Sequence, residues 1–207
     1  MAQTTLIRGD SADHGRACDL ILTDPPFDMS GAELARILER YHSPHLLLIT
    51  TMRQLLDFMS RTEWRLNFDF VLDGAMPKKA KSYQQPFYVH QTGVYLTRPG
   101  VRSAFDRRRR PRSDVFEANG YWPTIFRAPR DRAQEHGHAK NAAAVTDLLG
   151  SFAVGSVCDP FAGTGTTAIA AFDLDVPCTL IEKDQQTFDE LKRTCRFMGA
   201  YGMEIIE

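Results

Sequence analysis

Residues 157–167 read Val-Cys-Asp-Pro-Phe-Ala-Gly-Thr-Gly-Thr-Thr, and this stretch decides the fold class. Residues 156–158 predict a short strand, and residues 166–172 predict a helix. Between them, Gly163 and Gly165 let the backbone approach a ligand closely, and the start of the helix offers unpaired N–H groups. A strand, a glycine turn and a helix in this order are typical of a nucleotide-type binding turn in an α/β protein.

An acidic residue on each side of the glycine turn narrows the choice of ligand. Glu182 ends the next predicted strand, seventeen residues after Gly165, where a carboxylate can accept hydrogen bonds from both hydroxyls of a ribose. Asp159 precedes the turn, where a carboxylate would repel the pyrophosphate of a dinucleotide. It suits a cationic ligand better, and S-adenosylmethionine carries a sulfonium and an ammonium but no phosphate. We therefore expect S-adenosylmethionine as the cofactor.

Two alternatives to this interpretation stay open. Gly163, Gly165 and Ala168 also fit the glycine pattern of NAD-binding folds, which would make the chain a dinucleotide-binding oxidoreductase. A plain tight turn followed by a surface glutamate would need no ligand at all. The sequence lacks the GK(S/T) signature of a nucleoside-triphosphate site, so we do not expect such a ligand.

Predicted strands and helices alternate along most of the chain. Short apolar runs predict strands at residues 19–23, 45–50, 68–72, 93–97, 156–158 and 178–182. Helical spacing predicts helices at residues 32–41, 53–61, 141–152, 166–172 and 184–198. Such alternation is typical of a doubly wound, mostly parallel sheet. We expect one Rossmann-like α/β domain over residues 1–207.

Residues 24–27, Asp-Pro-Pro-Phe, follow a predicted strand, at the edge where open α/β sheets place their ligands. The prolines Pro25 and Pro26 fix the backbone, so that the Asp24 carboxylate and the Pro25 carbonyl become neighbouring acceptors. An exocyclic NH2 group of a nucleobase offers two donors that match them. Phe27 offers a face on which a base can stack. A proline-rich turn with a core phenylalanine is the alternative interpretation.

The two motifs and their order resemble the DNA amino-methyltransferases of the β class, in which the catalytic tetrad precedes the glycine turn. Residues 20–27 resemble that family's (D/N/S)PP(Y/F/W) motif, and residues 157–167 resemble its FxGxG motif. Residues 6–10 are similar to a short family segment whose acid, here Asp10, lies near the cofactor. The resemblance covers most of the chain except about residues 101–121.

The resemblance implies an S-adenosylmethionine-dependent methyltransferase fold and a set of site residues. The tetrad Asp24, Pro25, Pro26 and Phe27 would be catalytic. The residues expected at the cofactor are Asp10, Asp159, Phe161, Gly163, Gly165, Thr166, Thr167 and Glu182. An aspartate at the first tetrad position resembles the adenine-N6 enzymes more than the cytosine-N4 enzymes. The implied reaction is methyl transfer to N6 of adenine in DNA, with cytosine N4, RNA or protein glutamine as alternative acceptors.

A basic segment precedes the second half of the chain. Residues 98–132 hold ten arginines and four acids, although the whole chain has a net charge of −1. Phosphate backbones require such local basic patches, although a solvated arginine surface is the alternative. Residues 101–135 lack clear periodicity and are expected to be a short insertion or loop outside the core, the candidate DNA-recognition segment. The expected DNA contacts are Arg107, Arg108, Arg109, Arg110 and Arg112.

The bulk composition adds further expectations. Hydrophobic residues make up 43% of the 207 and charged residues 25%, which are ordinary globular values. No apolar run approaches the roughly 18–20 residues of a membrane span, and no signal-peptide pattern is visible, so we expect a cytoplasmic location in a bacterial host. None of the four cysteines forms a CxxC pair, and we expect free thiols and no metal site. The family resemblance also suggests a homodimer.

The interpretation depends on one spatial arrangement. The strand that ends at Asp24 and the strand that ends at Asp159 must lie side by side, so that both motifs border one cavity. The order of the motifs along the chain does not matter, because ligands bind at the carboxyl ends of neighbouring strands.

Overall fold

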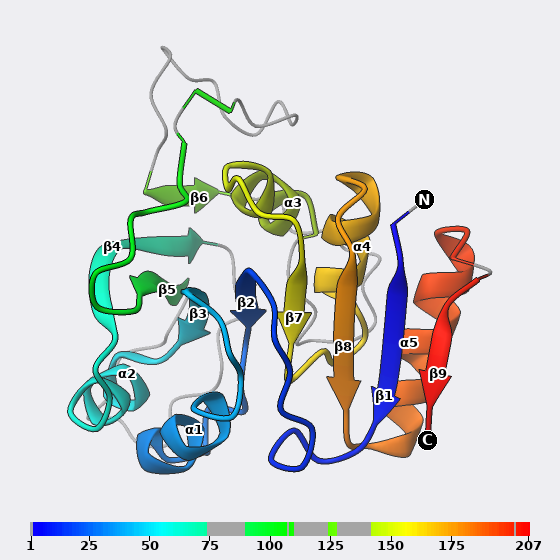
Figure 1. The fold of residues 1–207 in the computed structure, drawn as a ribbon, viewed down its shortest axis with the longest axis horizontal. Helices are drawn as coiled ribbons and strands as arrows, with labels where there is room; N and C mark the ends of the chain where they lie inside the picture. Colours follow the sequence, from blue (N-terminus) through cyan, green and yellow to red (C-terminus); the bar gives the residue numbers. More distant parts are fainter. Residues whose placement is uncertain (1, 74–89, 107, 110–123, 128–141, 201) are drawn as a thin grey trace, which may run out of the picture.

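The residues that the structure describes form one sheet with helices packed on it (Figure 1). The computed structural model describes residues 2–73, 90–106, 108–109, 124–127, 142–200 and 202–207. The strands are β1 (Thr4–Arg8), β2 (Leu20–Thr23), β3 (His45–Thr50), β4 (Arg65–Asp73), β5 (His90–Thr97), β6 (Ile125–Arg127), β7 (Val157–Asp159), β8 (Cys178–Glu182) and β9 (Glu204–Ile206). The helices are α1 (Gly31–Leu38), α2 (Met52–Met59), α3 (Ala142–Gly150), α4 (Thr166–Asp173) and α5 (Gln185–Phe197).

The sheet is mostly parallel. Its strands run in the order β6-β4-β5-β3-β2-β7-β8-β1-β9. Within the described ranges, β5 alone is antiparallel to its neighbours, β3 and β4, and the other neighbouring pairs are parallel. The doubly wound, mostly parallel sheet in a single domain, expected from the sequence, is thereby confirmed.

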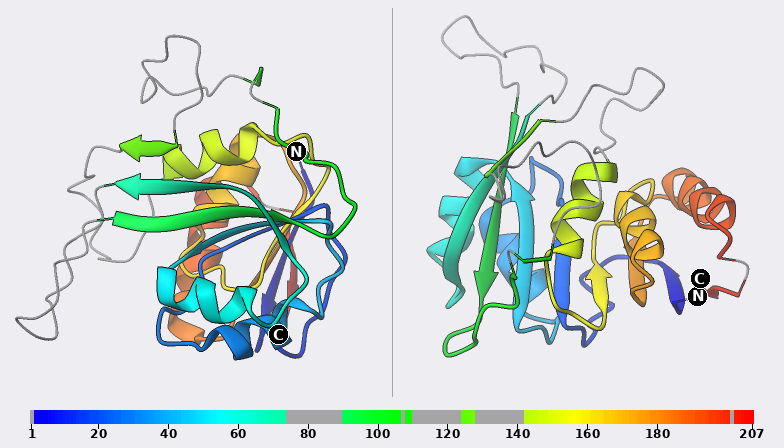
Figure 2. Two further views of the ribbon diagram at one scale, coloured as in Figure 1. Left: turned by 90° about the vertical axis from the view of Figure 1, so that its left-hand side faces the viewer. Right: turned by 90° about the horizontal axis from the view of Figure 1, so that it is seen from above.

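Helices cover both faces of this sheet (Figure 2). Successive residues of a strand face opposite sides. Leu20 and Leu22 of β2 therefore join the core that includes residues of α3, α4 and α5. Ile21 joins the second core, which includes residues of α1 and α2. Every residue of β2 and β3 is buried, as expected for central strands that are covered on both faces.

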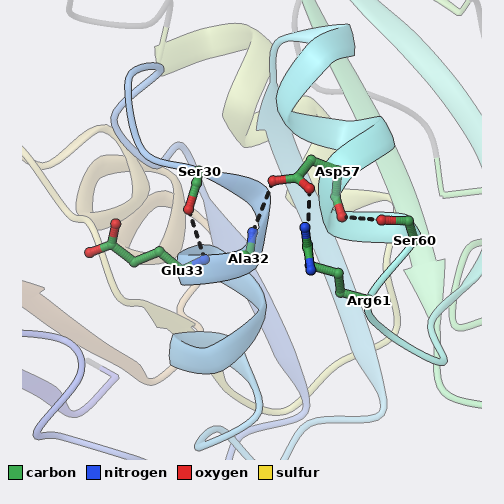
Figure 3. Close-up of polar contacts among 6 residues, drawn as sticks. All are labelled: Ser30, Ala32, Glu33, Asp57, Ser60 and Arg61. Atoms are coloured by element: carbon green, nitrogen blue, oxygen red, sulfur yellow. Dashed lines mark hydrogen bonds and ion pairs between the residues drawn. The ribbon is translucent and has the colours of Figure 1, made fainter.

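Short polar side chains fix the points at which α1 and α2 begin. The Ser30 hydroxyl accepts a hydrogen bond from the Glu33 N–H at 3.1 Å (Figure 3), and the Thr51 hydroxyl accepts one from the Gln54 N–H at 3.3 Å. Each cap satisfies a backbone donor that the first turn leaves unpaired, which is worth about 1 kcal/mol. The Ser30 cap therefore sets the residue at which the chain from the tetrad becomes helical.

Each predicted strand and helix occurs in the structure, with its ends shifted by a few residues. The sequence did not predict β1, β6 or β9. The strands β6 and β9 have three residues each and lie at the two edges of the sheet, so they are too short for an alternating pattern. The strand β1 begins with two threonines and ends with an exposed arginine. Its apolar residues are therefore only the pair Leu6 and Ile7, which is too short a run to predict a strand.

The expectation that residues 101–135 lie outside the core is wrong for two phenylalanines of that segment. Phe126 in β6 is fully buried, and its ring packs edge-on against Phe70 with 5.6 Å between centroids. Phe105 is half-buried and packs on Phe152, also at 5.6 Å. Single aromatic anchors in a polar stretch create no periodicity, and therefore the sequence did not reveal them.

The two strands on which the interpretation depends are neighbours. β2 pairs with β7 in parallel, with Leu20 opposite Val157 and Ile21 opposite Cys158. Because parallel strands end at the same edge, the tetrad and the glycine turn leave the sheet side by side. The arrangement that the sequence interpretation required is confirmed.

Candidate active site

One cavity of about 920 Å³ lies at the carboxyl ends of β1, β2, β7 and β8. Its volume is near the upper end of the range for small-molecule sites, which is about 300–1,000 Å³. The walls include all four tetrad residues, the glycine turn and Glu182. The structure thus brings the two sequence motifs into one cavity.

The Asp159 carboxylate joins the two motifs at the floor of this cavity. Its side chain is only 4% exposed and accepts three hydrogen bonds. Oδ1 accepts from the Thr23 hydroxyl at 2.7 Å and from the Phe161 N–H at 3.0 Å, and Oδ2 accepts from the Thr167 hydroxyl at 2.6 Å. Thr23 belongs to β2 and Thr167 to α4, so this carboxylate ties both motifs together.

Burial raises the pKa of Asp159 to about 6, although the hydrogen bonds from Thr167, Thr23 and the Phe161 backbone act in the opposite direction. The negative charge of Asp24 adds to the rise. A cation in the cavity would favour the ionised form of Asp159, because opposite charges attract more strongly in a buried site.

The two glycines of the turn are required for different reasons. Gly163 has φ 55° and a Cβ there would meet nothing within 4 Å, because this residue faces the cavity. Gly165 has φ 103° and caps α4, and a Cβ there would lie 2.8 Å from a methyl group of Leu191 in α5. Gly165 thus sits against α5 rather than in the cavity lining, whereas Phe161, Gly163, Thr166 and Thr167 do line the cavity.

Glu182 lies at the end of β8 and faces the glycine turn. Its carboxylate accepts hydrogen bonds from the Gly163 N–H at 3.0 Å and from the Asp184 N–H at 2.8 Å. These two donors fix the side chain at the cavity wall, with lone pairs left for a ligand. The position is suitable for accepting hydrogen bonds from ribose hydroxyls.

Asp10, just after β1, lines the cavity beside the end of β8, because Arg8 is the strand partner of Glu182. The Asp10 carboxylate accepts from the Ala12 N–H at 2.9 Å and from the Lys183 ammonium at 2.7 Å. The hydrogen bond from Lys183 and that from the Ala12 backbone lower the pKa of Asp10. Asp10 is therefore ionised at neutral pH.

The tetrad forms the end of the cavity nearest α1 and α2. Asp24 and Phe27 are half-buried, Pro25 is buried and Pro26 is exposed. The Pro26 carbonyl accepts hydrogen bonds from the Met29 N–H at 3.1 Å and from the Gln54 amide at 2.9 Å. These two donors occupy the acceptor capacity of the Pro26 carbonyl.

Sequence reasoning missed Gln54, although its signal was present. In α2 the buried residues are Gln54, Leu55 and Phe58, which places an amide on the apolar side of the helix. A buried amide must find hydrogen-bond partners, so a glutamine at a core position indicates a specific polar contact. The acceptors of its Nε2 could not be identified from the sequence, because they lie 25 and 28 residues away along the chain.

The predicted DNA contacts lie mostly outside the described residues. This holds for Arg107, Arg110 and Arg112 and for most of residues 101–135. Arg108 pairs with Asp106 at 2.9 Å and is 86% exposed. The guanidinium of Arg109 donates to the Phe152 carbonyl. Both described arginines thus contact other residues of the chain, and neither lines the cavity.

Three further properties concern only the residues that the structure describes. No group of three or more histidine, cysteine, aspartate or glutamate side chains is placed to hold a metal ion there. No helix in these ranges is long and apolar enough to cross a membrane. All four cysteines are free thiols, and Cys158, Cys178 and Cys195 are buried, so the prediction of free thiols is confirmed.

Comparison with known proteins reveals similarity of structure and none of sequence. No protein-family model matches the chain, and no curated protein sequence matches it. Among solved structures, the M1.HpyAVI–SAM complex is 18% identical, with a TM-score of 0.69 over 93% of this chain and 100% of that one. TTHA0409 from Thermus thermophilus, complexed with S-adenosyl-L-methionine, is 16% identical, with a TM-score of 0.68 over the whole of both chains.

A third similar structure is the cytosine-N4-specific PvuII DNA methyltransferase. It is 12% identical, with a TM-score of 0.72 over 100% of this chain and 95% of that one. At such identities a likeness of this kind shows the fold. The chain therefore has the α/β fold of S-adenosylmethionine-dependent methyltransferases.

Proposed function

We propose that this protein is a DNA methyltransferase that transfers a methyl group from S-adenosylmethionine to an exocyclic amino group of a base. The single observation that carries this proposal is the shared cavity. Asp24 and Phe27 of the tetrad border the same space as Gly163 and Glu182 of the glycine turn. An oxidoreductase would give the tetrad no role, whereas methyl transfer to an amine uses both motifs.

The charge of the cavity lining favours a cationic cofactor. Its bases are Arg36 and Lys183. Its acids are Asp10, Asp24, Asp28, Glu33, Asp159, Glu182, Asp184 and Glu190. A lining with this excess of carboxylates attracts a sulfonium and an ammonium and repels a pyrophosphate. The lining therefore supports S-adenosylmethionine over a dinucleotide.

The residues of the glycine end would hold the cofactor. Glu182 would accept hydrogen bonds from the ribose hydroxyls, and the turn at Gly163 would let the adenosine lie close to the backbone. Asp10 and Asp159 would provide negative charge, and Phe161, Thr166 and Thr167 would form part of the wall. Bound S-adenosylmethionine supplies an electrophilic methyl group on its sulfonium.

The tetrad would activate the amine. The lone pair of an exocyclic amine is delocalised into the ring, which makes the amine a poor nucleophile. The Asp24 carboxylate and the Pro25 carbonyl would accept hydrogen bonds from its two N–H groups and favour a more pyramidal nitrogen. Phe27 would stack on the base and hold it in line for the transfer, so that proximity lowers the barrier. Asp24 need not be a strong base, because the proton becomes acidic once the nitrogen is alkylated.

The target base must leave the duplex to reach this cavity, because the amino group lies within the helical stack. We propose that the basic segment at residues 101–135 contacts the phosphates of the flanking DNA, which would make binding depend on salt concentration. The similarity of fold to the PvuII DNA methyltransferase supports DNA as the substrate. The homodimer and the cytoplasmic location stay predictions.

Adenine N6 is the proposed target, because the tetrad begins with Asp24, as in the adenine-N6 enzymes that the sequence resembles. Cytosine N4 is the second candidate, and the similarity of fold to the cytosine-N4-specific PvuII enzyme favours it equally. Both bases present the same NH2 group, so the chemistry of the tetrad serves either.

The test is methylation of defined DNA by the purified protein with isotopically labelled S-adenosylmethionine. Mass spectrometry of the nucleosides is expected to find labelled N6-methyladenine; labelled N4-methylcytosine would establish the second candidate instead. RNA of the same sequence is the parallel substrate, and label in RNA but not in DNA would overturn the proposal. A thermal-shift comparison gives a second check, because S-adenosylhomocysteine should stabilise the protein and NADH should not.

A further inference from the structure

We propose that Gln54 of α2 is a positioning residue for the methyl transfer, because it fixes the shape of the tetrad loop. The inference rests on the proposed function and adds a residue from outside both sequence motifs. Gln54 is 4% exposed, so its amide can be satisfied only by partners within the protein.

The Gln54 amide is held in one orientation by three hydrogen bonds. Its Nε2 donates to the Pro26 carbonyl and to the Met29 carbonyl, both at 2.9 Å. Its Oε1 accepts from the Thr50 hydroxyl at 2.6 Å. Thr50 ends β3, next to β2, so the rigid sheet itself sets the direction of the amide.

The tetrad loop lacks two of its own backbone donors. Pro25 and Pro26 have no N–H groups, so this part of the loop cannot be held by backbone donors of its own. It can be held through its carbonyls. The one at Pro26 accepts from the Met29 N–H of the same loop and from the Gln54 amide, and the bond from Gln54 links the loop to α2. The Pro26 carbonyl lies one peptide unit from the Pro25 carbonyl, which is the proposed acceptor for the substrate amine. Fixing the first therefore restricts the direction of the second.

A neighbouring residue of the same helix offers a matched control. Asp57 lies three positions after Gln54, and its carboxylate accepts from the Ala32 N–H at 3.1 Å at the start of α1 (Figure 3). The two helices approach so closely here that a Cβ at Gly31 would meet the Phe58 nitrogen at 2.2 Å. Asp57 thus fastens α1 to α2 without contacting the Pro26 carbonyl, whereas Gln54 contacts that carbonyl directly.

The experiment compares Gln54→Leu with Asp57→Ala in the labelled methylation assay. Misplacement of a reacting group by about 1 Å costs on the order of 10²-fold in rate. We expect Gln54→Leu to lower kcat roughly 10- to 100-fold, with the Kd for S-adenosylhomocysteine changed by less than about twofold. Asp57→Ala should lower the thermal stability, yet keep kcat within about threefold, because the tetrad carbonyls keep their donor.

An isosteric variant separates positioning from folding. Gln54→Glu keeps an acceptor for Thr50 but loses both donors while the glutamate is ionised. Protonation restores one donor, so the ratio of its kcat to that of the wild type should rise as the pH falls. The kcat values are measured below the midpoint temperature of each variant, so that the unfolded fraction does not contribute.

Three outcomes would overturn the inference while the wild type remains active on DNA. They are a kcat within threefold of wild type for Gln54→Leu, an equal loss of kcat in Asp57→Ala, and a pH-independent ratio for Gln54→Glu. Absence of DNA methylation by the wild type would instead overturn the proposed function, so the two failures are distinguishable.

Discussion

Two aspartates at the carboxyl ends of neighbouring strands differ in their surroundings. Asp159 after β7 is 4% exposed and accepts three hydrogen bonds from the chain. Asp24 after β2 is half-buried and lines the cavity between the tetrad and the glycine turn. The topology brings the two acids together, but their environments fit them to different tasks. Asp159 links the two motifs, and Asp24 borders the space in which we propose that the substrate binds.

The largest expected effect distinguishes these tasks directly. Asp24→Ala should lower the rate of DNA methylation roughly 10³-fold, because it removes an acceptor that acts on the reacting amine. The Kd for S-adenosylhomocysteine, measured by calorimetry, should change by less than about threefold. Asp69→Ala, which removes an exposed acid of β4 outside the cavity lining, is the control and should keep most of the activity. Normal methylation by Asp24→Ala would show that the assigned role is wrong.

The second prediction concerns how the contribution of Asp159 to the stability of the fold depends on pH. Burial raises the pKa of Asp159 to about 6 from an ordinary value of 3.8, so the folded protein binds this proton more tightly than the unfolded chain. The contribution of Asp159 to the free energy of unfolding is therefore highest below about pH 4 and falls as the pH rises through 6. A shift of about two units corresponds to about 3 kcal/mol.

Asp159→Asn measures this contribution, because an asparagine does not titrate. Urea denaturation of both proteins between pH 4 and 7.5 should show the wild type losing stability relative to the variant as the pH rises. A difference in unfolding free energy that stays constant across this range would contradict the pKa assigned to Asp159.

A third acid, Glu182, is held by hydrogen bonds from the chain, as Asp159 is, and lines the cavity, as Asp24 does. It accepts two backbone hydrogen bonds. Glu182→Gln should weaken binding of S-adenosylhomocysteine about tenfold, or about 1.4 kcal/mol, because the neutral amide is a weaker acceptor for ribose hydroxyls. The exposed Glu63→Gln serves as the control for the loss of one charge. Unchanged affinity in Glu182→Gln would place the ribose elsewhere.

The smallest expected effect tests the hydrogen bonds that hold Asp159. Thr167→Val keeps the side-chain volume but removes the hydroxyl that donates to Asp159 at 2.6 Å. We expect a loss of about 1 kcal/mol in unfolding free energy at pH 7.5 and a smaller loss at pH 5, where Asp159 is protonated. Thr166→Val, at the neighbouring half-buried position, should change stability less. Equal losses in the two variants would indicate a general effect on α4.

The sequence predicted the site best where an apolar run that forms a strand is followed directly by a residue with a functional side chain. The apolar runs before Asp24 and Asp159 predicted β2 and β7, and their position at the edge of a parallel sheet predicted that they meet. The internal partners of Asp159 could not be predicted, because no pattern in the sequence indicates that the hydroxyls of Thr23 and Thr167 point at its carboxylate. Gln54 was missed for a related reason: its contacts depend on how α2 packs against the tetrad loop.

The pairing of β1 has a consequence for how the chain reaches its native state. This strand, residues 4–8, lies between β8 and β9, which hold residues 178–182 and 204–206. During synthesis, β1 therefore waits for β8 and β9, which follow much later in the chain, before either of its partners exists. Residues 9–12 at the cavity wall are fixed only after this long loop closes, which is a slow, entropically costly step. The cavity wall at residues 9–12 thus takes its place only after β8 has been made.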